Sequence, residues 1–202
     1  YFEKIDSEDQ SKTTKTPIPV EDVDSFYFYG EIDTNTKLLN FLAQKSIPIH
    51  VFNYYGYYSG SYYPREYLNS GFLLVKQVQH YESKRKRMEI AREFVRSAVH
   101  NILKNLTYYS NRKEGLSEFI SEVESEAESI DNTKKISGLM GIEGRIRERY
   151  YQSFNTILNT EMTFDKRVRR PPDSPINALI SFGNSLMYSA ALTEIYRTQL
   201  NP

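Results

Sequence analysis

The feature that most constrains the fold is a change of residue pattern near Gly71. Before it, the chain has aromatic and β-branched runs punctuated by glycine and proline, whereas neither glycine nor proline occurs between Gly71 and Gly115. The first pattern is typical of short strands, and a long unbroken stretch with an apolar period near 3.6 is typical of helices. The sequence therefore predicts an α+β fold, with a small N-terminal β domain (residues 1–76) and an all-helical domain (residues 77–202), the boundary lying near residues 70–82.

The predicted β domain contains strands and one short helix. Residues 25–32 and 47–64 are rich in aromatic and β-branched side chains, and Gly56 and Gly60 are expected to mark hairpin turns. Residues 35–46 have the pattern of a helix. We therefore expect a small sheet with one helix packed on it.

Two apolar stripes predict the core of the helical domain. The first comprises Met88, Ala91, Val95, Ala98, Ile102 and Leu106. The second comprises Leu116, Phe119, Ile120, Val123, Ala127 and Ile130. A further helix is expected around Glu143, and the last one is expected to begin at Asp173 or Ser174 as N-cap, with Pro175 just inside.

The composition excludes several classes of protein. The chain has no cysteine, which excludes a disulfide scaffold, a thiolate metal site and a cysteine nucleophile. It has no phosphate-binding glycine loop, serine elbow or HExxH pair, which disfavours nucleotide hydrolysis and acyl transfer. No apolar run approaches the length of a membrane span and no signal peptide is evident, so we expect a soluble, cytoplasmic protein without a membrane partner.

Charge is balanced overall but clustered along the chain. The sequence has 26 basic and 26 acidic side chains. Basic clusters lie at residues 84–87, 145–149 and 166–170, and an acidic block without basic residues spans 116–133. Each basic cluster taken alone fits either a solvated surface or a site for phosphate groups.

Glu143 is the residue whose position most needs a chemical explanation. In the stretch GLMGIEGRIRERYY (138–151), a helical wheel places it on the apolar face formed by Leu139, Ile142, Ile146 and Tyr150. A buried carboxylate needs a cation, a hydrogen bond, a proton or a metal ion. The residues leave two interpretations open, an ion pair with Arg147 and a metal site. Gly141 and Gly144 would allow another helix or a ligand to approach closely.

Two further sets of polar residues are candidates for a site. His50, His80 and His100 lack ligand spacing with Glu143 and with one another, so each is expected to be structural. Asn177, Ser181, Asn184 and Tyr188 form a polar line along the last expected helix, which is either a solvated face or one wall of a groove. The basic run before this helix and the helix N-terminus both suit phosphate.

Together these motifs resemble the Cas1 family, the CRISPR-associated endonuclease/integrase of spacer acquisition. The resemblance covers nearly the whole chain in family order. It rests on IPVEDVDSFYFYGE (18–31), IPIHVFNYYGYYSGSYYP (47–64), GIEG followed by RYY (141–151) and RVRRPPDSPINALISFGNSLMY (167–188). The family fold is a β domain followed by a helical domain, in agreement with the pattern above.

The resemblance implies a metal-dependent DNA reaction. Glu143 would be a ligand of Mg²⁺ or Mn²⁺, and a DNA 3′-hydroxyl would attack a phosphodiester of a CRISPR array, inserting a short spacer duplex. Tyr188 would be catalytic and Tyr150 would pack beneath the ligand. The DNA-binding residues would be Arg147, Arg167, Arg169, Arg170 and Asn177. Family proteins form homodimers through the β domain and work with a small partner, Cas2.

One departure from the family pattern concerns the metal ligands. The resemblance implies a histidine and a second acidic ligand on later helices, which the sequence ending at Pro202 does not contain, and the first strands are also missing. We therefore expect a truncated chain that is inactive by itself. Two alternatives stay open: a nucleic-acid-binding helical scaffold without catalysis, and a structural module in which Glu143 pairs with Arg147.

Overall fold

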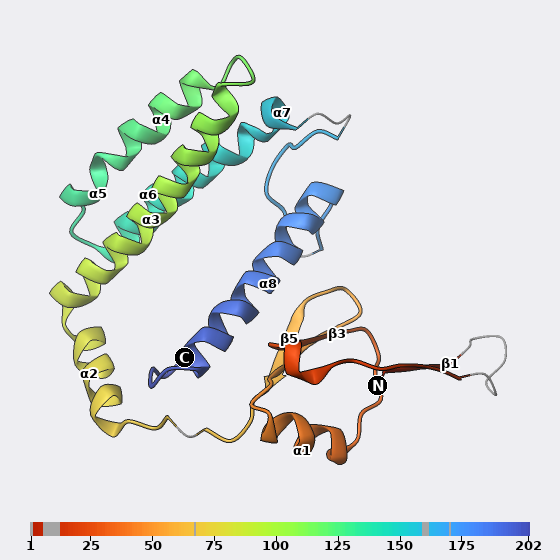
Figure 1. The fold of residues 1–202 in the computed structure, drawn as a ribbon. Coiled ribbons are helices and arrows are strands. Elements are labelled where there is room, and N and C mark those ends of the chain that lie inside the picture. Colours follow the sequence, from red (N-terminus) through yellow and green to blue (C-terminus); the bar gives the residue numbers. More distant parts are fainter. Residues whose placement is uncertain (1, 6–12, 67, 159–161, 170) are drawn as a thin grey trace. The chain divides into compact units, whose positions relative to one another are not determined.

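A computed structural model of the protein shows strands in its N-terminal part and helices in the rest (Figure 1). It describes residues 2–5, 13–66, 68–158, 162–169 and 171–202. The chain forms two compact units, Tyr1–Tyr67 with Ser189–Thr193, and Leu68–Tyr188 with Glu194–Pro202. This arrangement of strands followed by helices confirms the predicted α+β class.

The first unit contains two small sheets. Strands β1 (Phe2–Ile5) and β2 (Thr13–Thr16) form an antiparallel pair. The second sheet has the order β3-β4-β5, with β4 in the centre. In this sheet β3 (Phe26–Tyr29) runs parallel to β4 (Ile49–Phe52), and β5 (Tyr58–Tyr62) is antiparallel to β4. A short 3₁₀ helix, η1 (Val20–Asp22), precedes β3.

Helix α1 (Thr36–Gln44) connects the two parallel strands, as the sequence predicts. It begins at Asn35, whose side chain accepts a hydrogen bond from the Leu38 amide at 3.0 Å, as expected of an N-cap. Its Leu42 is buried with Ile47 and Ile49, and these three form the core of the unit. The crossover helix and the sheet thus bury the same apolar cluster.

The hairpin between β4 and β5 turns at only one of the two predicted glycines. Gly56 lies in the turn with φ of 74°, a conformation that residues with a side chain rarely adopt. Gly60 instead lies within β5, opposite Val51 and beside a bulge between Val51 and Phe52. The prediction of a turn at Gly60 is therefore wrong, because this glycine serves an irregular strand pair.

His50 lies at the centre of a buried polar cluster in the first unit. Its Nδ1 is 2.6 Å from Ser61 Oγ, and its Nε2 is 2.8 Å from Thr193 Oγ1 on the last helix. The Thr193 hydroxyl donates to the Ser189 carbonyl, so it accepts from His50 Nε2–H. His50 is fully buried, and burial lowers its pKa below the ordinary value of 6.5.

The second unit begins with α2 (Gly71–Glu82), so the predicted domain limit between residues 76 and 77 falls inside a helix. Ser70 caps the start of α2, and Ser83 both ends it and caps the next helix. The remaining helices are α3 (Lys84–Ser110), α4 (Ser117–Ala127), α5 (Ser129–Asn132), α6 (Ile136–Gln152), α7 (Phe154–Ile157) and α8 (Pro175–Tyr196).

Helices α3, α4 and α6 pack on one another around a continuous apolar core. Both predicted stripes contribute to it, since Met88, Leu106, Leu116, Val123 and Ile130 are all buried. Val99 is a further buried member that the first stripe did not include. From α6, the buried side chains are Leu139, Ile142 and Ile146.

Within the described part of the chain, the helices are either too short or too polar to span a membrane.

Candidate functional site

A cavity of about 360 Å³ lies between α6 and the segment that follows α7. It brings together four of the predicted site residues, Glu143 and Arg147 from α6 and Arg167 and Arg169 from the segment. Lys166 also lines it. Glu148 and Asp165 line it as well, so the cavity combines three carboxylates with four cationic groups, and the cationic excess suits a phosphodiester.

The packing of α6 explains how two charged residues reach this cavity. Ile142 and Ile146 are buried in the helical core, and Glu143 and Arg147 each lie one residue further along the helix. The side chain of Glu143 is 30% exposed and that of Arg147 is 47% exposed. Glu143 thus lies at the margin of the apolar face and not in its middle.

The glycines beside Glu143 do not serve the first of the two roles predicted for them, the close approach of another described helix. A Cβ atom added at Gly144 would meet no described atom within 4 Å, and one at Gly141 would meet the nearest, Arg145 Nη1, at 3.6 Å. Neither glycine is therefore needed for the close approach of another described helix. The absence of a side chain at Gly144 instead leaves space in the cavity wall.

Glu143 forms an ion pair with Arg147. Arg147 Nε donates to Glu143 Oε1 at 2.7 Å, four residues along the same helix. No group of three or more histidine or acidic side chains suited to a metal ion occurs among the described residues. Glu148 and Asp165 line the cavity together with Glu143, but the three do not form such a group, so these residues by themselves do not fit a complete Mg²⁺ or Mn²⁺ site.

The other arginines of the cluster at 145–149 are used for packing between helices. Arg145 donates to both carboxylate oxygens of Glu126 on α4, at 2.9 and 2.8 Å. Arg149 Nε lies 3.2 Å from a carboxylate oxygen of Glu122, which is also on α4. The hydrogen bond from Arg145 lowers the pKa of Glu126. Part of the acidic block thus neutralises one side of α6, and Arg147 is the arginine of this cluster that lines the cavity.

The segment that follows α7 carries the basic residues Lys166, Arg167 and Arg169, and we call it the basic segment. It is anchored at its start by Asn155, a residue that the sequence interpretation missed. Asn155 Nδ2 donates to the Phe164 carbonyl at 2.8 Å, and its Oδ1 accepts from the Phe164 amide at 2.7 Å. The Phe164 ring is buried and lies 5.9 Å from the ring of Phe154 and 5.7 Å from that of Tyr151. The amide pair and the aromatic cluster together fix where the segment enters the cavity.

Asn177 and Ser181 of α8 hold the same segment from its other side. Asn177 is 1% exposed, and its side chain bonds to the backbone at Lys166 and Val168 and to the Arg167 guanidinium. Ser181 Oγ accepts from Arg167 Nη2 at 2.8 Å. A direct contact between Asn177 and DNA would require these bonds to open. Half of the predicted polar line on α8 therefore faces the basic segment.

The remaining predicted residues do not join this arrangement. Tyr188 is 55% exposed, and in the described part of the chain it is not among the residues that line the cavity. Asn184 is also exposed. Arg170, predicted to bind DNA, lies outside the described residues.

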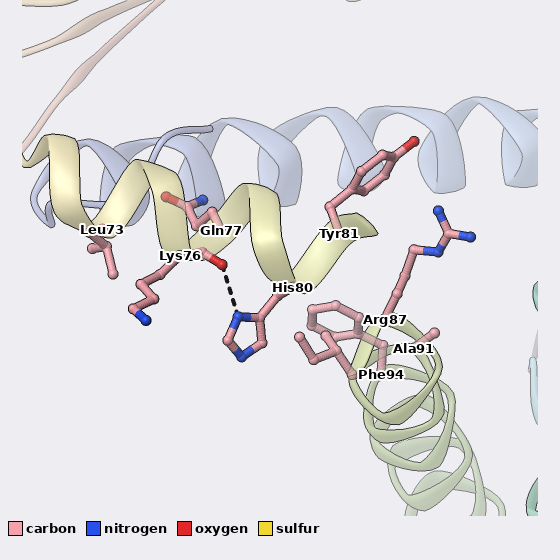
Figure 2. Close-up of a pocket in the computed structure, with 9 residues that line it drawn as sticks. Leu73, Lys76, Gln77, His80, Tyr81, Arg87, Ala91 and Phe94 are labelled. Carbon is pink, nitrogen blue, oxygen red and sulfur yellow. Dashed lines mark hydrogen bonds between the residues drawn. The ribbon is translucent and has the colours of Figure 1, made fainter. Parts of the chain in front are cut away.

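A second, larger cavity of about 580 Å³ lies between α2 and α3 (Figure 2). Its walls are mostly apolar, and Phe94 there is 73% exposed. Figure 2 shows His80 bonded to the Lys76 carbonyl, at 2.8 Å, and Arg87 near the Tyr81 ring. None of the predicted site residues lines this cavity. His80 is thus held by its own helix.

Comparison with known proteins identifies the family. The model of the family described as CRISPR associated protein Cas1 matches residues 4–202. The chain belongs to the Cas1 family. A CRISPR-associated endonuclease Cas1 from Fusobacterium nucleatum is 50% identical over 191 residues, which cover 95% of this chain and 56% of that relative. This Cas1 chain therefore spans less than two thirds of the length of that relative.

Solved structures show the same fold. A Cas1 protein from Thermotoga maritima has 44% sequence identity and a TM-score of 0.81, over 96% of this chain and 60% of that one. A partial Cas6-RT-Cas1–Cas2 complex contains a chain with 25% identity and a TM-score of 0.59, over 96% of this chain and 57% of that one. The cavity lies where two of the motifs that carried the resemblance meet, GIEG with its arginines and the run RVRR.

Proposed function

We propose that this Cas1 protein is a DNA endonuclease and integrase that inserts short spacer duplexes into a CRISPR array, in prokaryotic adaptive immunity. The observation that carries this proposal is the meeting of Glu143, Arg147, Arg167 and Arg169 around one cavity. Relatives at 50% and 45% identity are named CRISPR-associated endonucleases, which supports the same class of reaction. The reaction is a transesterification: a DNA 3′-hydroxyl attacks a phosphodiester of the array, a new P–O bond forms, and the array strand leaves with a 3′-hydroxyl that takes up a proton in place of the one lost by the attacking hydroxyl.

The cationic residues bind and orient the DNA backbone in this proposal. A concave surface lined by guanidinium groups attracts a polyanion, and each guanidinium offers adjacent N–H donors to phosphate oxygens. Phosphate contacts fix the position of DNA without reading its sequence. Arg147, Arg167 and Arg169 therefore hold the attacked phosphodiester in the cavity, and Arg170 extends the basic run. Tyr188 takes part in catalysis at the border of the site.

We further propose that the reaction depends on Mg²⁺ or Mn²⁺ and that Glu143 is one of the ligands. Such an ion, when bound, supplies Lewis-acid stabilisation of charge on the phosphate. Because the described residues do not form a complete metal site, no step of the reaction is assigned to the ion. Glu143 is the residue that we propose offers it a carboxylate oxygen.

The partners of the protein follow from the same proposal. They are the spacer duplex, the CRISPR repeat, a second Cas1 subunit in a homodimer, and the small protein Cas2. The similarity to a chain of a partial Cas6-RT-Cas1–Cas2 complex supports an assembly with Cas2. The site of action is the cytoplasm of a prokaryote.

Strand transfer by Glu143→Gln tests the function. The variant keeps the shape of the side chain and removes its charge, so the full-length protein with Cas2 should lose at least about a hundredfold in the rate of spacer integration, as when a group that acts in the transition state is removed. Far-UV circular dichroism should stay unchanged. Glu124→Gln, on the exposed side of α4, is the matched control. Normal integration by Glu143→Gln would refute the proposal.

The alternative of a scaffold without catalysis is separated from an enzyme by a metal titration. Branched DNA is incubated with the protein and increasing Mn²⁺, and cleavage and binding are followed together. A scaffold binds with an affinity that falls with salt and cleaves nothing. An enzyme cleaves only when Mn²⁺ is present, and Glu143→Gln abolishes the cleavage.

The alternative of a structural module is favoured by one observation, the ion pair between Glu143 and Arg147. The double variant Glu143→Arg with Arg147→Glu restores the pair with its charges exchanged. Because such exposed pairs contribute only about 0.3–0.5 kcal/mol, its stability should stay close to that of the unchanged protein. An unchanged integration rate in this double variant would show that the ion pair is only structural, and loss of integration at unchanged stability would show that Glu143 acts in the reaction.

A further inference from the structure

We propose that Asn177 is a positioning residue that fixes Arg167 as a preformed phosphate-binding group. The inference deepens the proposed function, since it rests on the cavity binding DNA phosphate. It assigns to Asn177 a role that acts through Arg167 rather than on DNA, because Asn177 is buried and Arg167 lines the cavity.

All hydrogen-bonding positions of the Asn177 amide are occupied. Oδ1 accepts from Arg167 Nη1 at 3.0 Å and from the Val168 amide at 3.2 Å. Nδ2 donates to the Lys166 carbonyl at 2.9 Å and to Asp173 Oδ1 at 2.7 Å. An amide has two acceptor lone pairs and two donors, so the group is satisfied. With the amide reversed, donors would face donors and acceptors would face acceptors, so the surroundings fix its orientation.

The start of α8 fixes the backbone of Asn177. The Ser174 hydroxyl accepts a hydrogen bond from the backbone N–H of Asn177 at 3.3 Å, as expected of an N-cap, and α8 begins at Pro175. The side-chain amide of Asn177 therefore projects from the first turn of a helix and not from a loop. A group carried on a regular element holds a neighbour more rigidly than a loop does.

Arg167 is held along one edge of its guanidinium. Nη1 donates to Asn177 Oδ1, to the Asn177 carbonyl at 3.3 Å and to the Val168 carbonyl. Nη2 donates to Ser181 Oγ at 2.8 Å. Among the hydrogen bonds of the described chain, these leave Nε–H and the second Nη2 hydrogen for another acceptor. These two neighbouring donors are the pair that binds a phosphate with two parallel hydrogen bonds.

The clamp has a consequence for DNA binding. A free arginine loses much side-chain entropy when it binds a phosphate, and an arginine already held in the binding conformation loses less. Asn177 and Ser181 hold Arg167 in this way before DNA arrives. Removing the clamp should therefore weaken DNA binding even though the guanidinium itself remains.

The first arm of the test measures the clamp without DNA. Limited digestion with trypsin cuts after Lys166, Arg167 and Arg169 when the segment opens, but not after Arg170, because Pro171 follows. Asn177→Ala should raise the cleavage rate at these bonds about tenfold or more, as the segment loses its hydrogen bonds to α8. Asn184→Ala, an exposed asparagine on the same helix, is the matched control and should leave the rate unchanged.

The second arm measures DNA affinity in a double-mutant cycle. Asn177→Ala should weaken binding of a spacer duplex by the full-length protein about as much as Arg167→Ala does. In the Arg167→Ala background, Asn177→Ala should have no further effect, because the two residues act as one unit. A merely structural role would lower affinity by the same factor in both backgrounds.

A third variant keeps the test valid if Asn177→Ala fails to fold. Ser181→Ala leaves the Asn177 side chain intact and removes only the hydrogen bond from Arg167 Nη2. It should weaken DNA binding about threefold, and it should have no further effect on affinity in the Arg167→Ala background. Equal losses in the two backgrounds would refute the clamp.

The remaining outcomes are also decisive. Unchanged DNA affinity in a folded Asn177→Ala variant would overturn the inference, and so would equal losses in the two arginine backgrounds. If the unchanged protein protects the segment from trypsin but does not bind DNA, the proposed function fails. Arg167 is then held by Asn177 but is not a phosphate-binding group, so the inference fails as well. If the segment is cleaved equally in Asn177→Ala and in the unchanged protein, the clamp alone fails.

Discussion

Helices α6 and α8 both carry candidate site residues, but different kinds of side chain hold them in place. The buried residues of α6, Leu139, Ile142 and Ile146, are all apolar and belong to the core of the helical unit. Of the four buried residues of α8, only Ile176 is apolar. The other three are Asn177, Ser189 and Thr193.

The two helices show two ways in which a protein fixes the position of a helix, apolar packing and hydrogen bonding. Apolar packing stabilises strongly but is not directional, so α6 is fixed mainly by how well its side chains fill the core. Hydrogen bonds stabilise less on balance but demand particular partners and directions, so α8 is fixed by which groups it meets. The position of Glu143 accordingly depends on the packing of α6 in the core, and that of Arg167 depends on hydrogen bonds to Asn177 and Ser181.

The largest effect should come from the apolar helix. Ile146 is 1% exposed within the core, so Ile146→Ala should lower the free energy of unfolding by about 2–5 kcal/mol, through lost apolar burial and a cavity. Met140 on the same helix is 65% exposed, and Met140→Ala should change it by less than about 0.5 kcal/mol. Urea unfolding followed by circular dichroism measures both. Equal effects would show that α6 is not held by its apolar face.

A smaller effect is expected from the polar helix. Thr193→Val keeps the shape of the side chain but leaves His50 Nε2–H without its acceptor, which should cost about 1–3 kcal/mol. Thr198→Val is the matched control, because the Thr198 hydroxyl bonds only to exposed backbone groups near the end of α8 among the described residues: it donates to the Ile195 carbonyl and accepts from the Leu200 amide. If the two threonines gave the same result in urea unfolding, directional bonding would not be what fixes this end of α8.

The same contrast decides what could be predicted from the sequence. The apolar period of the helical domain identified the core of α3, α4 and α6, because packing follows spacing along one chain. It could not show that Glu143 lines a cavity, since that depends on where the segment after α7 runs. Nor could it show that Asn177 is buried, because an asparagine at that spacing fits a solvated face equally well and only its partners at 166–168 reveal its role.

The error in the β part has a local cause. Gly60 looked like a turn residue, but a glycine also suits a bulged strand pair, and only the pairing with Val51 distinguishes the two. The first helix of the second unit begins at Gly71 because Ser70 caps α2, and Ser83 caps α3 immediately afterwards. The motifs themselves were sufficient for the family, which the match over residues 4–202 confirms.

The smallest effect concerns the protonation of His50, which the polar end of α8 makes sensitive to pH. In the neutral ring Nε2–H donates to Thr193, so Nδ1 accepts from Ser61, whose hydroxyl oxygen is also 2.7 Å from the Tyr58 hydroxyl. The rings of Tyr27 and Tyr63 flank the imidazole. A proton on Nδ1 would force the Ser61 hydroxyl to turn so that its oxygen accepts the new N–H. This reorientation should lower the free energy of unfolding by less than removal of the Thr193 hydroxyl does.

The direction of the pH effect follows from the lowered pKa. Because burial lowers the pKa of His50 below 6.5, the unfolded chain takes up this proton at a higher pH than the folded chain does. The free energy of unfolding should therefore be constant above about pH 7.5 and fall as the pH drops through about 6.5, where an unperturbed histidine titrates. His50→Asn should flatten this part of the profile, and His80→Gln, at a histidine that is bonded to the Lys76 carbonyl of its own helix, is the matched control. A profile that keeps its slope in His50→Asn would show that the polar cluster around Thr193 does not sense pH.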